Sequence, residues 1–218
     1  GFDVSELHMT AQLIAGQTVD LLFEGLAASV TKVVTDDYGY VTGTSQTVVI
    51  EGGSTITGNL AFIKQEGGVE ILDFTMNLEG GVHLSGNVNL SKDAPGALVP
   101  KHLQTVTINS TGTLANPQTG KTGNIISGKL TAGSEGEGTQ NELLDVTINA
   151  SQALSIEGGV DFSAVVNSDE VATLTVNGTA NVTIGDLNTQ DEGVDGLNVV
   201  NNGTGTLTVG INAANIDS

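Results

Sequence analysis

One segment of this sequence occurs twice with the same pattern of apolar, polar and glycine residues. LDFTMNLEGGVHLSG (72–86) and LDVTINASQALSIEG (144–158) align without a gap, 72 positions apart. A catalytic site brings unlike residues together once, whereas a repeated pattern indicates structural units that stack and bury a core together. The repeat therefore predicts an architecture before it predicts any chemistry.

The repeated unit reads as a short strand of alternating polarity, an Asn, a few small residues and a second strand. Its anchors Phe74, Val106, Val146 and Leu174 are separated by 32, 40 and 28 residues, and 178–185 matches 203–210 at an offset of 25. Spacing of this kind indicates connections of variable length between strands that keep a constant register, as in a solenoid.

The rest of the chain follows the same alternation, broken by Gly and Asp turns. Aromatic residues make up only 3% of the sequence, and the apolar residues occur in short runs beside abundant Thr, Asn and Gly. We predict an all-β protein, with an irregular parallel β-solenoid of the β-helix or β-roll kind as the favoured fold. An antiparallel β-sandwich is the alternative, which forms if the strands pair as hairpins across the Asn-containing turns.

The three prolines suggest where the chain divides. Two of them lie in DAPGALVPKH, where the turn-forming residues indicate a boundary. We predict an N-terminal β region over 1–92, a Pro-containing linker over 93–102 and a repeat-bearing β-solenoid region over 103–218. The two regions are also compatible with one continuous elongated domain.

The charge balance excludes several partners. The chain has 25 acidic residues and 6 basic ones, for a formal net charge of −19, and every basic residue is Lys. Nucleic-acid binding needs clustered cations, so it is excluded. No run of 18 apolar residues exists, which predicts no membrane span, and the absence of Cys excludes disulfides and thiolate chemistry. An acidic chain without Cys that is rich in Thr, Gly and Asn favours an extracellular, cell-surface location.

The sequence shows no catalytic constellation. It lacks the GxSxG, HExxH and P-loop patterns, and its three His lie far apart at positions 8, 83 and 102. His83 alternates with apolar neighbours and is expected on the polar face of a strand. We therefore predict that the protein is not an enzyme.

Acidic clusters in turn-like segments are the candidate sites. Carboxylates in Gly-containing loops are the hard oxygen ligands that Ca²⁺ prefers, and a strongly negative chain favours cation binding. Neither the EF-hand loop nor the RTX calcium nonapeptide is present. The predicted calcium ligands are Asp36, Asp37, Asp186, Asp191, Glu192 and Asp195.

The C-terminal half carries a family likeness. VATLTVNGTANVTIGDLN (171–188) and LNVVNNGTGTLTVGINAANID (197–217) resemble the repeat-rich β-solenoid region of bacterial S-layer and type-I-secreted (RTX-like) cell-surface proteins. This resemblance implies extracellular self-assembly into a lattice or fibre, with calcium ordering the subunits.

These observations lead to one expected function and two alternatives. We expect a structural extracellular surface protein that self-assembles into an S-layer, filament or adhesive fibre with Ca²⁺ support. Its expected partners are copies of itself and cell-surface polysaccharide. The alternatives are a pilin- or adhesin-like β-sandwich subunit that polymerises by strand exchange, and a carbohydrate-active β-helix protein.

Overall fold

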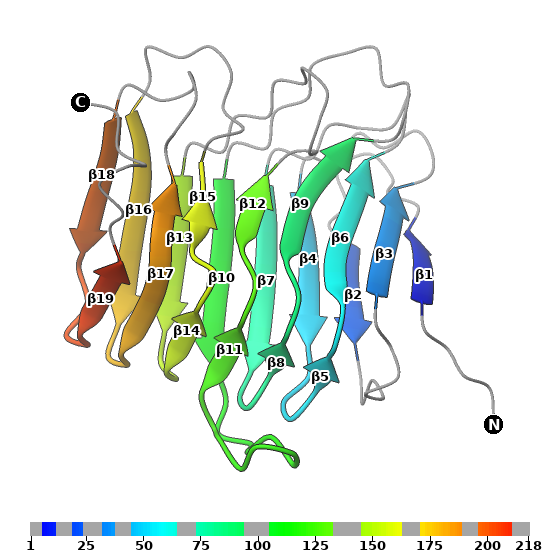
Figure 1. The fold of residues 1–218 in the computed structure, drawn as a ribbon, viewed down its shortest axis with the longest axis horizontal. Helices are drawn as coiled ribbons and strands as arrows, with labels where there is room; N and C mark the ends of the chain where they lie inside the picture. Colours follow the sequence, from blue (N-terminus) through cyan, green and yellow to red (C-terminus); the bar gives the residue numbers. More distant parts are fainter. Residues whose placement is uncertain are drawn as a thin grey trace.

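The protein winds as a β-solenoid (Figure 1). The structure is a computed structural model that describes residues 6–11, 19–23, 32–37, 45–64, 73–93, 105–132, 145–162, 171–188 and 196–210. Within these residues the regular elements are all strands, and all of their pairings are parallel. The all-β solenoid prediction is confirmed and the antiparallel alternative is wrong. No helix in the described part could cross a membrane.

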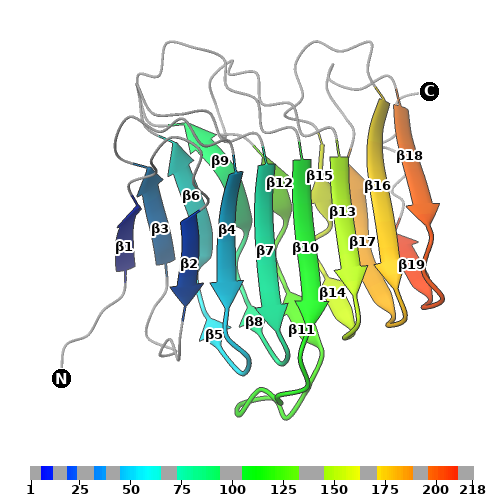
Figure 2. The same cartoon turned by 180° about the vertical axis from the view of Figure 1, so that it is seen from behind.

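One side of the solenoid is a seven-stranded sheet among the described residues, which we call the long sheet (Figure 2). Its strands follow one another in chain order along the rod, so each coil of the solenoid adds one strand. They are β2 (Val19–Phe23), β4 (Ser45–Ile50), β7 (Asp73–Glu79), β10 (Thr105–Thr111), β13 (Asp145–Ala150), β16 (Val171–Gly178) and β18 (Gly196–Asn201).

The remaining described strands form a 12-stranded sheet that folds into two flanks. The short flank contains β5 (Thr55–Ile56), β8 (His83–Leu84), β11 (Asn124–Ile126), β14 (Leu154–Ile156) and β19 (Leu207–Gly210). The far flank contains β1 (Glu6–Ala11), β3 (Lys32–Asp37), β6 (Asn59–Lys64), β9 (Val88–Asp93), β12 (Leu130–Ala132) and β15 (Val160–Asp161).

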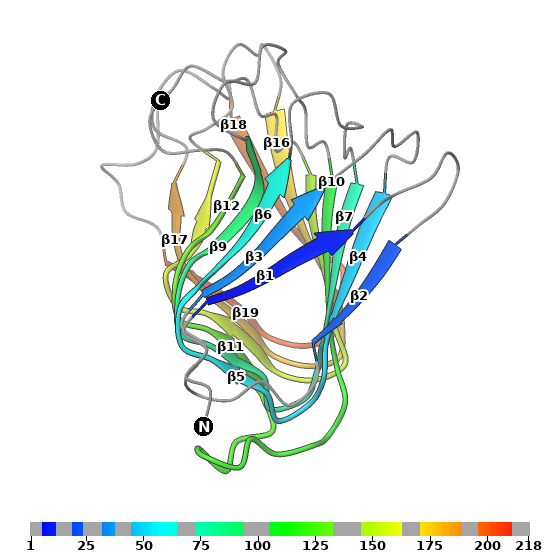
Figure 3. The same cartoon turned by 90° about the vertical axis from the view of Figure 1, so that its right-hand side faces the viewer.

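Strand β17 (Val182–Asn188) joins the two flanks. Its first residues pair with β14 and its last residues pair with β15, and its register shifts between Ile184 and Asp186. The three sides are visible when the rod is seen end-on (Figure 3). Each coil therefore passes from the long sheet to the short flank and then to the far flank.

The strand register matches the repeat in the sequence. Val106 pairs with Phe74 on one side and with Val146 on the other, and Val146 pairs with Leu174. The spacings of 32, 40 and 28 residues are therefore coils of different length with their long-sheet strands in strict register. The same sheets also continue across the predicted linker, because β10 pairs with β7 and β12 pairs with β9.

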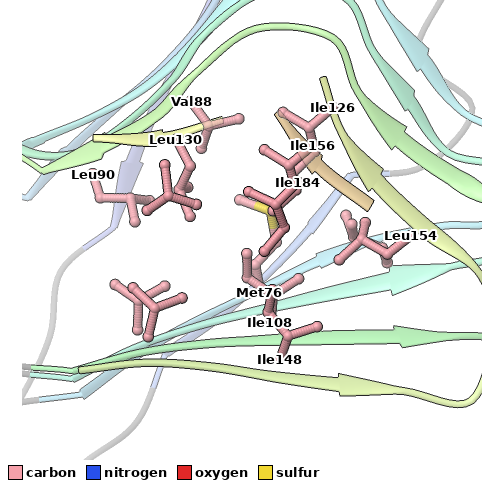
Figure 4. Close-up of a cluster of buried hydrophobic side chains, with 14 of the residues drawn as sticks. Met76, Val88, Leu90, Ile108, Ile126, Leu130, Ile148, Leu154, Ile156 and Ile184 are labelled. Carbon is pink, nitrogen blue, oxygen red and sulfur yellow. The ribbon is translucent and has the colours of Figure 1, made fainter. Parts of the chain in front are cut away.

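Side chains from all three sides meet in an apolar core (Figure 4). Met76, Ile108 and Ile148 point inward from the long sheet, opposite Ile156 and Leu130 from the two flanks. All five are fully buried. The alternation of polarity in each strand places one set of side chains in this core and the other set on the outer surface.

The glycine that closes each repeat lies at the corner between the two flanks. A Cβ on Gly158 would lie 2.4 Å from the backbone of Gly128, and one on Gly128 would lie 2.3 Å from Gly86. Successive coils thus touch through their backbones at this corner, which leaves no room for a side chain. Close backbone stacking explains why 72–86 and 144–158 both end in Gly.

Candidate functional site

The first pair of predicted calcium ligands closes a strand. Asp36 and Asp37 are the last two residues of β3, where their backbones pair with Thr10 and Ala11 of β1 and with Ile63 and Lys64 of β6. Their expected position in a turn between strands is therefore wrong.

The second group of predicted ligands is represented by Asp186. It is half-buried at the register shift in β17, while Asp191, Glu192 and Asp195 lie outside the described residues. Strands β6, β9, β12 and β15 separate β3 from β17. At about 4.8 Å per strand, Asp36 and Asp186 are roughly 24 Å apart and belong to different sites. Among the described residues, no three His, Asp or Glu side chains gather as a metal site would require.

The outer surface of the long sheet carries a ladder of asparagines. Asn109 donates from Nδ2 to Asn77 Oδ1 (2.7 Å), Asn149 donates to Asn109 (2.9 Å), and Asn177 donates to Asn149 (2.9 Å). All four are half-buried. A continuous ladder of identical amides links coils whose connections differ in length, which explains the Asn near the end of the first strand of these repeats.

The far flank carries an ion pair between adjacent coils. Lys129 Nζ lies 3.5 Å from Asp161 Oδ2, and Asn188 Nδ2 donates to Asp161 Oδ1 (3.0 Å). The Lys129 side chain is half exposed, so water weakens the attraction. This group, like the Asn ladder, ties coil to coil.

The last described coil has an apolar inner surface that no described residue covers. Val199 pairs with Leu174 and so lies above the core, yet it is 42% exposed. Leu197, Leu207 and Val209, which also pack against the core, are only partly buried. Strands β18 and β19 each pair with one neighbour among the described strands. This end of the described rod therefore presents apolar side chains together with the edges of parallel strands.

A long connection interrupts the regular corners between the long sheet and the short flank. At the other described corners of this kind the chain turns over three to five residues, as at 80–82, 51–54 and 202–206, but between β10 and β11 it uses 112–123. This connection, the corner loop, extends below the rod (Figure 1). Residues 111–115 and 117–122 are exposed, and Leu114 is 58% exposed.

Asn116 anchors the corner loop. Its side chain is 1% exposed and donates from Nδ2 to Gly81 O (2.8 Å) and Thr55 Oγ1 (3.0 Å), which belong to the two preceding coils. Its Oδ1 accepts from Gln118 N (2.9 Å) and Thr119 N (3.1 Å). One amide thus holds the turn of the loop and fastens it to the rod.

Two more buried polar side chains, those of Asn124 and Ser110, form hydrogen bonds at the corner where the loop leaves the rod. Asn124 replaces the apolar residue found at this position in adjacent coils, accepting from Val82 N (3.0 Å) and donating to Leu78 O (3.1 Å) and Ser110 Oγ (2.8 Å). Ser110 Oγ donates to Gln152 O (2.8 Å). These bonds satisfy backbone groups that the long loop would otherwise leave buried and unpaired.

We expect the variant Asn116→Ala to free the corner loop while the rod stays folded. Loss of the amide leaves buried groups of two coils unpaired, which costs about 1–3 kcal/mol and should accelerate tryptic cleavage after Lys121 by about tenfold or more. Cleavage at this bond is measured by mass spectrometry of the peptides. The control Gln118→Ala changes an exposed side chain of the same loop; equal acceleration in both variants would contradict the anchoring role.

By composition alone, the polar, Gly-rich segment that contains the corner loop is compatible with one long loop or with a pair of weak strands. The structure divides it, because 112–123 is a loop while Asn124–Ile126 and Leu130–Ala132 are strands. The order Asn116, Pro117 and Gly120 is the available signal for an ordered turn, since Asn caps turns, Pro fixes φ and Gly120 has a φ of 67°. No comparable signal in the sequence reveals that Asn116 reaches two other coils.

In comparisons with known proteins, no family model, no curated protein and no solved structure matches this chain.

Proposed function

We propose that this chain is a structural protein of a cell surface, which self-assembles through the ends of its solenoid into a lattice, filament or adhesive fibre with Ca²⁺ support. The observation that carries the proposal is the inner surface of β18 and β19, which no described residue covers and where half-exposed Val199 lies directly above Leu174 of the core. A further coil supplied by a second copy would bury these side chains and pair both strand edges.

The coil-to-coil contacts support the same proposal. The Asn ladder, the apolar core and the glycine corner recur from coil to coil with little change. Because each coil contacts its neighbours in the same way, a stacked copy would meet a surface close to one that the rod already packs against. Extracellular location, the absence of catalysis and the use of calcium are parts of the proposal that stand on the sequence.

Assembly is tested by a matched pair of valine substitutions. We expect Val199→Asp to raise the concentration needed for polymerisation at least about tenfold, because a carboxylate would be buried without a partner at the junction. Val171→Asp is the control, since Val171 is 55% exposed but lies on the outer surface of the long sheet. Particle size is followed by light scattering and electron microscopy. Equal loss of assembly in both variants, or in neither, would contradict the end-to-end contact.

Calcium is tested in the same assay. We expect millimolar Ca²⁺, the concentration range of weak extracellular sites, to promote ordered polymers and to raise the melting temperature. Circular dichroism follows the melting of the parent protein with calcium and with chelator. A melting temperature and a particle size that do not respond to calcium would rule out its role and leave assembly by strand and core contacts alone.

A further inference from the structure

The corner loop is longer than the connection that the rod requires at this corner. Neighbouring coils turn the same corner over three residues, whereas this coil uses 112–123 and needs three buried polar side chains to do so. Ordered surface loops on a rigid scaffold are where binding residues collect. The surface beside this loop is therefore a place where a ligand could lie.

The return limb of the corner loop forms the wall of an open trough of about 490 Å³. The loop leans toward the preceding coils, where Gly81 N donates to Thr122 O (2.8 Å) and Asn116 is fastened. On its other side, no described residue covers the following coils of the short flank at the trough. Ile125 of β11, Ser155 of β14 and Thr183 of β17 lie side by side there as the floor.

The side chains that line the trough are chemically complementary to a ligand that carries a negative charge and many hydroxyl groups. Lys121, which is exposed, supplies a positive charge, while Thr122, Ser155 and Thr183 supply hydroxyl groups that both donate and accept. Asn181 accepts from Thr206 N through Oδ1 (3.0 Å), which leaves its NH₂ group as a donor. None of the described residues that line the trough is a carboxylate; Glu157, two residues beyond Ser155, lies outside this lining.

The net negative charge of the chain makes this trough a favoured place for an acidic ligand. A net charge of −19 repels an acidic ligand from most of the surface, so a cation without an adjacent carboxylate marks a favourable place for one. Sugar hydroxyls match the hydroxyl and amide groups of the floor, and a sugar carboxylate matches Lys121. The absence of aromatic side chains from the lining favours hydrogen bonding over ring stacking.

We propose that this trough binds an acidic oligosaccharide, with Lys121 contacting a sugar carboxylate and Ser155, Asn181 and Thr183 contacting hydroxyl groups. The proposal goes beyond structural assembly and stands whether or not the chain polymerises. It assigns the trough to a saccharide chain lying across β11, β14 and β17.

The test is a titration of ¹⁵N-labelled protein with a short oligogalacturonate in calcium-free buffer. We expect the amide resonances of 121–125, 154–155 and 181–183 to shift. We expect Lys121→Gln to weaken binding about two- to fivefold, as the loss of one partly exposed charge pair allows. Lys129→Gln is the matched control, since Lys129 is an exposed lysine on the far flank, paired with Asp161. Thr183→Val should also weaken binding, whereas Thr175→Val on the long sheet should not.

Several outcomes would overturn the proposal. An absence of shifts, or an equal effect of Lys121→Gln and Lys129→Gln, would remove the trough as the site. Equal binding of a neutral malto-oligosaccharide of the same length would remove the anionic specificity. Tighter binding of an acidic peptide would replace the saccharide by a protein partner. Because the assay contains no calcium and reads resonances of the trough rather than particle size, its failure leaves the assembly proposal untouched.

Discussion

The variant Gly159→Ala is expected to lose at least about 4 kcal/mol of stability, the largest effect of any single substitution considered for this rod. Gly159 lies at the corner before β15 with a φ of 86°, and an added Cβ would lie 1.8 Å from Asp186 O. That oxygen is backbone and sits at the register shift of β17, where the chain bends from one flank to the other. It cannot rotate away as a side chain would, so two coils must separate.

Gly120→Ala separates this steric effect from backbone strain. Gly120 in the corner loop also has a positive φ, of 67°, but an added Cβ there meets nothing within 4 Å. We therefore expect it to cost only about 1–2 kcal/mol. Urea denaturation followed by circular dichroism compares the two variants with the parent. Similar losses in both would show that the close approach of Gly159 and Asp186 is not a structural constraint.

Much of this architecture follows from the sequence because in a solenoid local and global signals agree. The alternation in VTIN at 106–109 and 146–149 sets the buried face of each strand, and the recurring Asn marks a position where identical amides bond across coils. In a parallel stack, equivalent positions of successive coils pair with each other. Alignment of the repeat therefore predicts the pairing of Val106 with Phe74 and Val146 directly.

The corners could not be predicted in the same way. Asn124 occupies an inward position that is apolar in adjacent coils, and in the sequence it is one more polar residue of a Gly-rich segment. Its role depends on which backbone groups the corner loop leaves unpaired, and those belong to residues up to 46 positions away. Side-chain-to-backbone bonds of this range leave no periodic signal.

The candidate metal ligands show a different limit of sequence reasoning. A pair such as Asp36-Asp37 followed by YGY resembles a turn by composition, but in a parallel sheet the strand continues for as long as its neighbours offer pairing. Here β1 and β6 extend β3 through both residues. The tertiary environment thus overrides a weak local preference, and an acidic composition alone does not specify where a cation would bind.

The repeated strands and the irregular corner loop therefore differ in how freely their residues can be substituted. The strands and glycine corners repeat, so a substitution there alters the contacts with the coils on both sides. Among the described coils the corner loop occurs once and is fastened to the rod through Asn116, so it can change its exposed residues, such as Leu114 and Lys121, without altering the stack. The binding proposed for the trough could therefore vary on this loop while the strand contacts proposed for assembly are preserved.

The variant Ile148→Ala is expected to lose about 2–5 kcal/mol, because Ile148 is fully buried between Ile108 and Val176 and its removal opens a cavity that the coils on either side cannot close. The neighbouring Thr147→Ala is the matched control, since Thr147 lies on the outer surface of β13 and should cost less than about 1 kcal/mol. Urea denaturation of both variants measures the difference. Equal losses would mean that the inner and outer faces of the long sheet are not distinguished as the alternation of polarity requires.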